Sequence, residues 1–134
     1  MLENGHRLAL KVTRGRWPRT LLGMEPVELH TIGRRSGERR STMLTSPLID
    51  GAKVVLVASK GGHSDHPDWY KNLSADPHVE ITRDSVTVPM LARTATGDER
   101  AELWPRIVAS YKGYEGYQRN TDREIPVVIC EPAT

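Results

Sequence analysis

Residues 41–59, STMLTSPLIDGAKVVLVAS, contain two largely apolar runs on either side of Asp50-Gly51. Asp-Gly is favoured in two-residue turns between antiparallel strands, because its positive φ angles match the right-handed twist of the strand pair. The stretch therefore predicts a β-hairpin whose strands are Ser41–Ile49 and Lys53–Ser59.

Hydrophobic periodicity predicts further elements on both sides of this hairpin. They are, in chain order, a weak helix over Leu2–Val12, a strand from Val27 to Thr31, a helix from Pro67 to Leu73, strands over Val79–Thr82 and Val86–Val88, a helix from Thr96 to about Tyr111, and a strand over Ile125–Cys130. Thr96 and Glu99 match a capping box. In this motif the Thr hydroxyl accepts a hydrogen bond from a free amide of the first helical turn, and the Glu carboxylate reaches back to the backbone amide of the Thr. Pro89 indicates a sheet edge or a bulge.

The resulting order, αβββαββαβ, contains hairpin-joined strands instead of parallel βαβ units. We therefore expect an α+β fold with an antiparallel sheet or small barrel, and a nucleotide-binding fold built from parallel strands is disfavoured. We divide the chain into a basic, helical or flexible N-terminal segment, residues 1–20, and a single domain, residues 21–134.

The composition is that of a soluble globular protein, with 134 residues, 37% hydrophobic and 27% charged. The longest apolar run, Val54–Ala58, is far shorter than a membrane-spanning helix. The first residues lack the apolar core of a signal peptide, so a cytoplasmic location is expected. The single Cys130 stands among apolar residues and is interpreted as part of the core.

Positive charge is concentrated in the first third of the chain. Residues 1–43 carry nine Lys and Arg against four acidic residues, although the net charge of the whole chain is only +2. This imbalance favours a localised anionic partner: a phosphate-bearing cofactor, a nucleic acid or a lipid surface.

The stretch Gly33–Ser41, GRRSGERRS, places four arginines between two predicted strands. Glycines let backbone amides turn toward an anion, and guanidinium groups match phosphate or carboxylate oxygens with paired donors. The pattern suits a ligand with a phosphate tail. A solvated basic hairpin and a nucleic-acid patch remain the alternatives.

A second candidate is Ser59–Gly62, SKGG, directly after a buried strand, where a glycine pair lets the backbone approach a flat or phosphorylated ligand. A loose turn is the alternative. His63, Asp65 and His66 stand in the same loop, but the two histidines are three residues apart and no third ligand occurs at a matching spacing. No metal is therefore predicted. Trp69 either contacts a ligand or anchors the short helix.

The third candidate is the tyrosine cluster Tyr111, Tyr114 and Tyr117, which Gly113 and Gly116 interrupt. This segment is interpreted as a cap over a pocket, in which a phenol could donate a hydrogen bond or a proton. Packing of the rings against the barrel is the alternative. Because no hydrolytic or zinc-binding pattern occurs, a bound cofactor is expected to bring the reactivity.

Several motifs occur together in order: GRRSG (33–37) with RST (40–42), ASKGG (58–62), HPDWY (66–70) with NL (72–73), YEGYQ (114–118), TDR (121–123) and IPV (125–127). With them the chain, from about Arg14 to Pro132, resembles the deazaflavin-dependent nitroreductase and quinone reductase family, small actinobacterial proteins that use coenzyme F420. The resemblance implies a small antiparallel split β-barrel, like that of FMN-binding proteins, with flanking helices.

The resemblance also implies a role for each candidate residue. The implied cofactor-binding residues are Arg34, Arg35, Ser36, Gly37, Arg40, Ser41, Thr42, Ser59, Lys60, Gly61, Gly62, Pro67 and Trp69. Among these, the Arg-rich loop and Lys60 would bind the phosphate and carboxylate tail of the coenzyme. The implied catalytic residues, around the acceptor, are Tyr111, Tyr114, Tyr117 and Ser59.

The implied activity is hydride transfer from reduced coenzyme F420 to a small electrophilic acceptor, such as a quinone, enone, lactone or nitroaromatic. The alternatives are an FMN-binding split-barrel oxidase and a non-catalytic flavin- or deazaflavin-binding module. A nucleic-acid partner is not expected, and the oligomeric state stays open. The basic N-terminal segment, with Lys11, Arg14 and Trp17, suggests peripheral contact of this cytoplasmic protein with a membrane.

Overall fold

The computed structural model describes residues 22–133. The N-terminal segment 1–20, with its expected helix over Leu2–Val12, lies outside these residues. The described elements are β1 (Leu22–Ile32), β2 (Arg39–Asp50), β3 (Lys53–Val57), a 3-10 turn η1 (Lys60–Gly62), α2 (Asp68–Ala75), β4 (His78–Arg83), β5 (Val86–Thr94), α3 (Gly97–Ser110), α4 (Gly113–Arg119) and β6 (Val127–Pro132).

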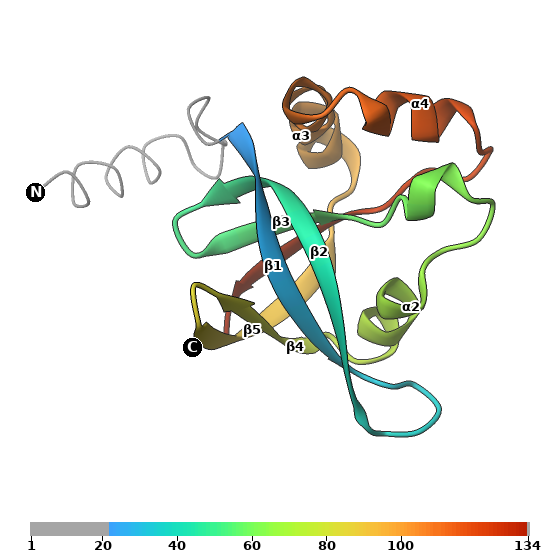
Figure 1. Ribbon diagram of the computed structural model, residues 1–134. Coiled ribbons are helices and arrows are strands. Elements are labelled where there is room, and N and C mark those ends of the chain that lie inside the picture. Colours follow the sequence, from blue (N-terminus) through green and yellow to red (C-terminus); the bar gives the residue numbers. More distant parts are fainter. Residues whose placement is uncertain (1–21, 134) are drawn as a thin grey trace, which may run out of the picture.

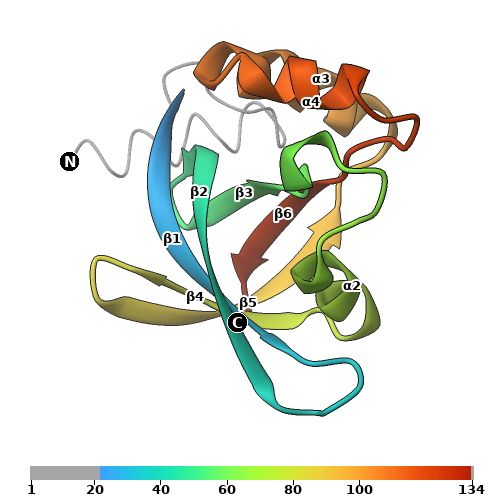
Figure 2. The same cartoon turned by 45° about the vertical axis from the view of Figure 1, so that its right-hand side comes forward.

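The strands close into an antiparallel barrel in the order β1-β2-β3-β6-β5-β4 (Figure 1). The α+β antiparallel barrel expected from the sequence is therefore confirmed. In both views α3 and α4 lie together over one end of the barrel, and α2 lies nearer the free end of the β1–β2 hairpin (Figure 2). No helix within the described residues is long and apolar enough to cross a membrane.

The hairpin predicted at Asp50-Gly51 is present. Asp50 pairs with Lys53, and Gly51 has a φ of 61°, which is the backbone conformation that glycine tolerates best. The second predicted hairpin also forms, between β4 and β5. Pro89 lies in the part of β5 that pairs with β4 but precedes the pairing of β5 with β6, so its missing amide hydrogen leaves no gap in that ladder.

The predicted capping box at the start of α3 is wrong. Thr96 occupies the N-cap position, but its side chain makes no capping hydrogen bond. Glu99 instead accepts two hydrogen bonds from the Arg93 guanidinium on β5, at 2.6 and 3.1 Å. A charge-assisted paired contact is stronger than a hydrogen bond to one backbone amide, so Glu99 binds Arg93 instead of capping the helix.

Several other boundaries differ from the prediction. The strand β1 begins at Leu22, five residues earlier than expected, and β5 continues to Thr94, six residues further. Pro67 is the N-cap of α2 instead of its first helical residue, and the last strand begins at Val127, two residues later than expected. These differences are at element ends, where hydrophobic periodicity carries least information.

The core has two layers separated by the barrel wall. The inner layer collects side chains from the strands around the barrel, together with two from α2: Val27, Leu29, Val54, Leu56, Ala58, Val79, Ile81, Met90, Ala92, Val128 and Cys130, with Trp69 and Leu73. The outer layer packs α3 and α4 onto the alternate residues of β2, β3 and β6: Leu48, Val55, Val127 and Ile129, with Ala95, Leu103, Ile107 and Tyr114. The strands β3 and β6 are apolar on both faces for this reason.

Cys130 is buried in the inner layer, as expected. Burial raises the pKa of its thiol to about 12, so the sulfur stays protonated at neutral pH.

Candidate active site

The Arg-rich loop forms one wall of a pocket of about 640 Å³ between the β1–β2 hairpin and α2. Most residues predicted from this loop line it: Arg34, Arg35, Ser36, Arg40, Ser41 and Thr42. Trp69, at the start of α2, also lines it. Gly37 does not, because its φ of 73° closes the turn, where its amide donates to the Gly33 carbonyl at 2.8 Å.

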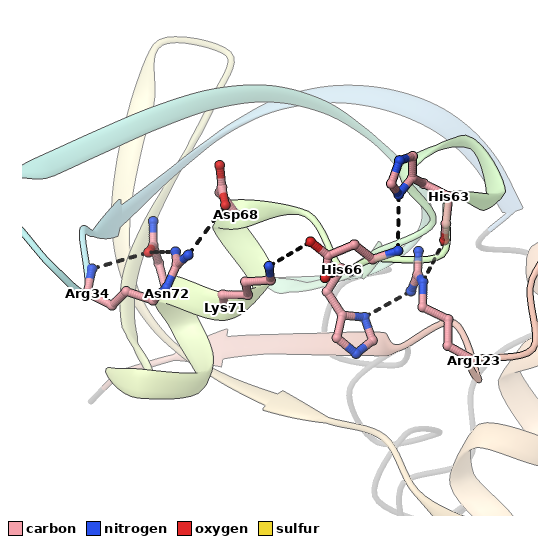
Figure 3. Close-up of polar contacts among 8 residues, drawn as sticks. Arg34, His63, His66, Asp68, Lys71, Asn72 and Arg123 are labelled. Atoms are coloured by element: carbon pink, nitrogen blue, oxygen red, sulfur yellow. Dashed lines mark hydrogen bonds and ion pairs between the residues drawn. The ribbon is translucent and has the colours of Figure 1, made fainter.

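Arg34 is fixed to α2 at the floor of this basic pocket (Figure 3). Its backbone amide and its Nη1 both donate to Oδ1 of Asn72, at 3.2 and 2.9 Å. Its Nη2 lies 3.5 Å from Asp68. Asn72 is 5% exposed and also donates to Thr31 on β1, so the Arg34 side chain is held by a buried amide that is itself hydrogen-bonded to the barrel.

The other arginines of the loop differ in how their charge is compensated. Arg39 lies 2.8 Å from the Glu80 carboxylate. Arg40 donates only to the Ser36 hydroxyl, at 3.3 Å, and within the described residues neither Arg40 nor Arg35 forms an ion pair. Both guanidinium groups therefore keep their donors for an anionic ligand.

A second pocket, of about 440 Å³, adjoins the first. It contains most of the remaining predicted residues: Ser59, Lys60, Gly61, Pro67, Trp69, Tyr111, Tyr114 and Tyr117. Trp69, whose side chain is mostly buried in the inner core layer, lines both pockets, so the basic pocket and this aromatic pocket meet at this residue. Together they suit an elongated ligand with an anionic end and a flat, apolar end.

The three tyrosine rings pack against one another and come from two helices. Tyr111 is the C-cap of α3, whereas Tyr114 and Tyr117 lie on α4. The ring centroids are 5.2 to 6.2 Å apart, and the hydroxyls of Tyr111 and Tyr117 are 3.3 Å apart. The rings thus pack together and line the pocket at once.

The hydroxyls of Tyr114 and Tyr117 stay protonated at neutral pH. Burial, with smaller contributions from Tyr117 and Tyr111, raises the pKa of Tyr114 to about 12. The hydrogen bond with Tyr111 raises the pKa of Tyr117. Among the described residues the Tyr114 hydroxyl has no hydrogen-bond partner, so it remains free to bind a ligand.

The Ser59–Gly62 segment is a tight turn with three successive left-handed residues. The φ angles are 46° at Lys60, 63° at Gly61 and 83° at Gly62. Gly62 does not line the pocket: a Cβ there would lie 2.7 Å from the carbonyl oxygen of Tyr117. Gly62 therefore lets the turn pack directly against α4, which joins two walls of the aromatic pocket.

The histidines of the following loop make polar contacts within the protein. Asp65 lies 2.8 Å from Lys71, and Nδ1 of His66 accepts from Arg123. Residues 22–133 contain no group of three or more His, Cys, Asp or Glu side chains that could hold a metal ion.

Several residues of the site were not predicted from the sequence. The basic pocket also includes Thr31, Asp68 and Asn72, and it includes Arg39, which was predicted only as part of the Arg-rich stretch. The aromatic pocket also includes Met24, Met43, Leu44, Thr45, Leu56 and Val57. Asp68 and Asn72 are four residues apart on the predicted helix, a polar pair on one face that could have been recognised. The strand residues carry no such signal.

The closed six-stranded antiparallel barrel, with two pockets that share Trp69, defines a protein of the split-barrel type. Residues 6–132 match the F420H(2)-dependent quinone reductase family, and the chain belongs to that family. The resemblance drawn from the motifs is therefore confirmed, and the family name carries the expected cofactor, coenzyme F420.

Relatives and solved structures agree with this membership. The chain is similar to a putative F420H(2)-dependent quinone reductase of Mycobacterium tuberculosis, with 39% identity over 102 residues that cover 74% of this chain and 82% of the relative. Another F420H(2)-dependent quinone reductase of the same organism is 35% identical over 128 residues, which are 92% of this chain and 85% of the relative. The structure of the F420-H2 dependent reductase FDR-A matches with a TM-score of 0.73 and 38% identity, covering 83% of this chain and 97% of that one.

Proposed function

We propose that the chain is an F420-dependent oxidoreductase that reduces a quinone or a related small electrophilic acceptor. The observation that carries the proposal is the meeting of the two pockets at Trp69. The basic pocket suits the phosphate and carboxylate tail of the coenzyme, and the aromatic pocket suits its ring together with an acceptor. The family membership supports the same cofactor.

The residues present fit the coenzyme. Arg35 and Arg40 are without ion pairs among the described residues, and forked guanidinium donors match phosphate and carboxylate oxygens. Arg34, fixed by Asn72, adds a third guanidinium at the same pocket. In the aromatic pocket, Pro67 contributes an apolar surface, Trp69 lies where this pocket joins the basic one, and the turn at Lys60–Gly61 lines the space that the ring would occupy.

Reduced F420, when bound, supplies the hydride. The chain's own part is to hold the acceptor against the ring and to stabilise negative charge as it develops on the acceptor oxygen. We assign this role to Tyr114, because it lines the pocket, stays neutral and has no partner for its hydroxyl among the described residues. Ser59, which lines the same pocket, is the second candidate donor.

Anaerobic mixing with reduced F420 and a set of quinone, enone and nitroaromatic acceptors tests the function. We expect oxidised F420 to appear in proportion to acceptor consumed, and to do so fastest with at least one quinone. A protein that binds F420 but oxidises it with none of these acceptors would be a carrier, and the proposed activity would be wrong.

We also propose that residues 1–20 bring the protein to an anionic membrane. Three exposed apolar side chains at the aromatic pocket support this: Met24, Met43 and Tyr111, with exposed fractions of 40, 65 and 42%. Sedimentation with anionic vesicles, compared between the natural chain and a variant with Lys11, Arg14, Arg16 and Arg19 changed to Ser, tests the idea. Equal sedimentation would contradict it.

A further inference from the structure

The Arg123 side chain forms hydrogen bonds with several parts of the loop that follows β3 (Figure 3). Its Nε donates to the carbonyl of His63 at 2.8 Å, its Nη1 to that of Ala58 at 3.1 Å, and its Nη2 to that of Ser59 at 2.8 Å. Nη1 also lies 2.9 Å from Nδ1 of His66. One guanidinium thus binds three backbone carbonyls and one imidazole across residues 58–66.

This loop, residues 58–66, contains the strained wall of the aromatic pocket. Ser59, Lys60 and Gly61 line the pocket, and Lys60 has a φ of 46°, a conformation that costs energy for a residue with a side chain. Such a conformation persists only where the surroundings impose it. Within the turn itself, the described backbone bonds are two: Gly62 to Ser59 at 2.9 Å and His63 to Lys60 at 3.1 Å.

We propose that Arg123 is a positioning residue, which holds the Ser59–Gly61 wall in the conformation that the coenzyme ring and the acceptor meet. Arg123 itself does not line either pocket, so it acts through the carbonyls that it binds. The proposal deepens the proposed function and rests on it only for the readouts that use F420.

His66 reports on the same contact. Its Nδ1 faces a guanidinium that can only donate, so this nitrogen must accept and stay unprotonated. Burial, followed by the charge of Arg123, lowers the pKa of His66. The other groups around this imidazole are Asp65, Lys71 and the ring of Tyr70, whose centroid lies 4.9 Å away. Removal of Arg123 should therefore raise the pKa of His66.

Arg100 on α3 provides a matched control. It is also a half-buried arginine that binds the segment before β6, donating to the Ile125 carbonyl at 2.7 Å and stacking on Trp104 at 4.7 Å. It lines neither pocket and, among the described residues, has no hydrogen bond or ion pair with residues 58–66. Its Nη2 also donates to Oε1 of Gln118 on α4, at 3.4 Å, so changes at Arg100 loosen the same segment and its contact with α4 but remove no hydrogen bond from the Ser59–Gly61 wall.

The test is amide hydrogen exchange in the cofactor-free protein, measured for Arg123→Met, Arg123→Lys, Arg100→Met and Arg100→Lys. Exchange at the amides of Gly62 and His63 is expected to speed up by about tenfold or more in the Arg123 variants, because those amides close the turn. The Arg100 variants should leave both rates within about twofold of the natural protein. If Arg123→Met does not fold, the test rests on Arg123→Lys. Lysine keeps the positive charge but lacks the paired donors of a guanidinium group.

Two further readouts separate positioning from general loss of stability. An NMR titration should show a higher pKa for His66 in Arg123→Met, which removes the positive charge, and not in the Arg100 variants. Fluorescence titration should show weaker F420 binding for Arg123→Lys than for Arg100→Lys. Unchanged exchange at Gly62 and His63, or equal effects in the two sets of variants, would overturn the proposal, whereas failure of the natural protein to bind F420 would overturn only the proposed function.

Discussion

Gly113 and Gly116 interrupt the tyrosine segment equally in the sequence, yet their surroundings differ. A Cβ at Gly113 would lie 2.4 Å from the ring of Tyr111, so this glycine leaves the space that the ring occupies. At Gly116 the nearest atom to such a Cβ is Nη2 of Arg119, at 3.8 Å. Only one of the two glycines is therefore needed by the pocket.

We predict that Gly113→Ala displaces the Tyr111 ring and lowers acceptor turnover while leaving the melting temperature nearly unchanged, because an exposed ring can move aside. Gly116→Ala is the control and should stabilise the protein by about 0.5–1 kcal/mol, since alanine favours helix over glycine. Steady-state kinetics and thermal unfolding check both variants. Equal turnover in the two variants would mean that the position of Tyr111 is unimportant for the reaction.

The hydroxyl of Tyr114 is the group that we expect to act on the acceptor. Tyr114→Phe keeps the ring and its packing, so turnover should fall by about tenfold or more while the affinity for F420 is retained. Stopped-flow reoxidation and fluorescence titration measure the two quantities. Unchanged turnover would return this tyrosine to a packing role.

The raised pKa of Tyr114 also predicts how stability depends on pH. An unfolded tyrosine loses its proton near its ordinary value of 10, whereas the folded one keeps it to about 12. Between these values the folded state holds more protons, so the free energy of unfolding falls as pH rises. Denaturant unfolding at increasing pH should show a shallower decline for Tyr114→Phe, and parallel curves would contradict the assignment.

At the scale of elements, α2 links the two pockets by contributing Trp69 to both and Asn72 to the floor of one. Asn72→Leu would remove a buried acceptor from two donors of Arg34 and should lower both stability, by about 1–3 kcal/mol, and F420 affinity. Ser74→Ala, at an exposed position of the same helix, is the control. Chemical denaturation and fluorescence titration provide the measurements, and F420 affinity equal to that of the natural protein would contradict the role of Asn72.

The elements that the sequence predicted are those with local causes. The hairpin at Asp50-Gly51 follows from turn chemistry, and β6 follows from an apolar run. The capping box failed because Glu99 binds Arg93. The end of α3 near Tyr111 was predicted, but the short helix α4 was not, because two glycines within its seven residues lower the helix propensity of the segment. Likewise Arg123 gained no role from the sequence, since its partners lie about sixty residues away, at separations of 57 to 65.

For the whole molecule, the arrangement that matters is a cationic pocket beside an aromatic one, which meet at Trp69 on α2. Because charged contacts are screened by salt, F420 affinity should decrease as ionic strength rises. Arg40→Ala should weaken binding most at low salt and so flatten this dependence. Arg119→Ala removes the same charge from an exposed site on α4 and is the control. Titrations over a range of salt concentrations test this, and identical slopes for all three proteins would argue against a tail-binding pocket.

The most direct measurement compares the affinity of the protein for F420 with its affinity for a deazaflavin that lacks the phosphate and carboxylate tail. If the basic pocket holds the tail, the shortened compound binds about a hundredfold or more weaker, and a double variant, Arg35→Gln with Arg40→Gln, binds both compounds with similarly low affinity. If the natural protein binds the two compounds equally well, the arginines do not hold the tail, and the account of the site is wrong.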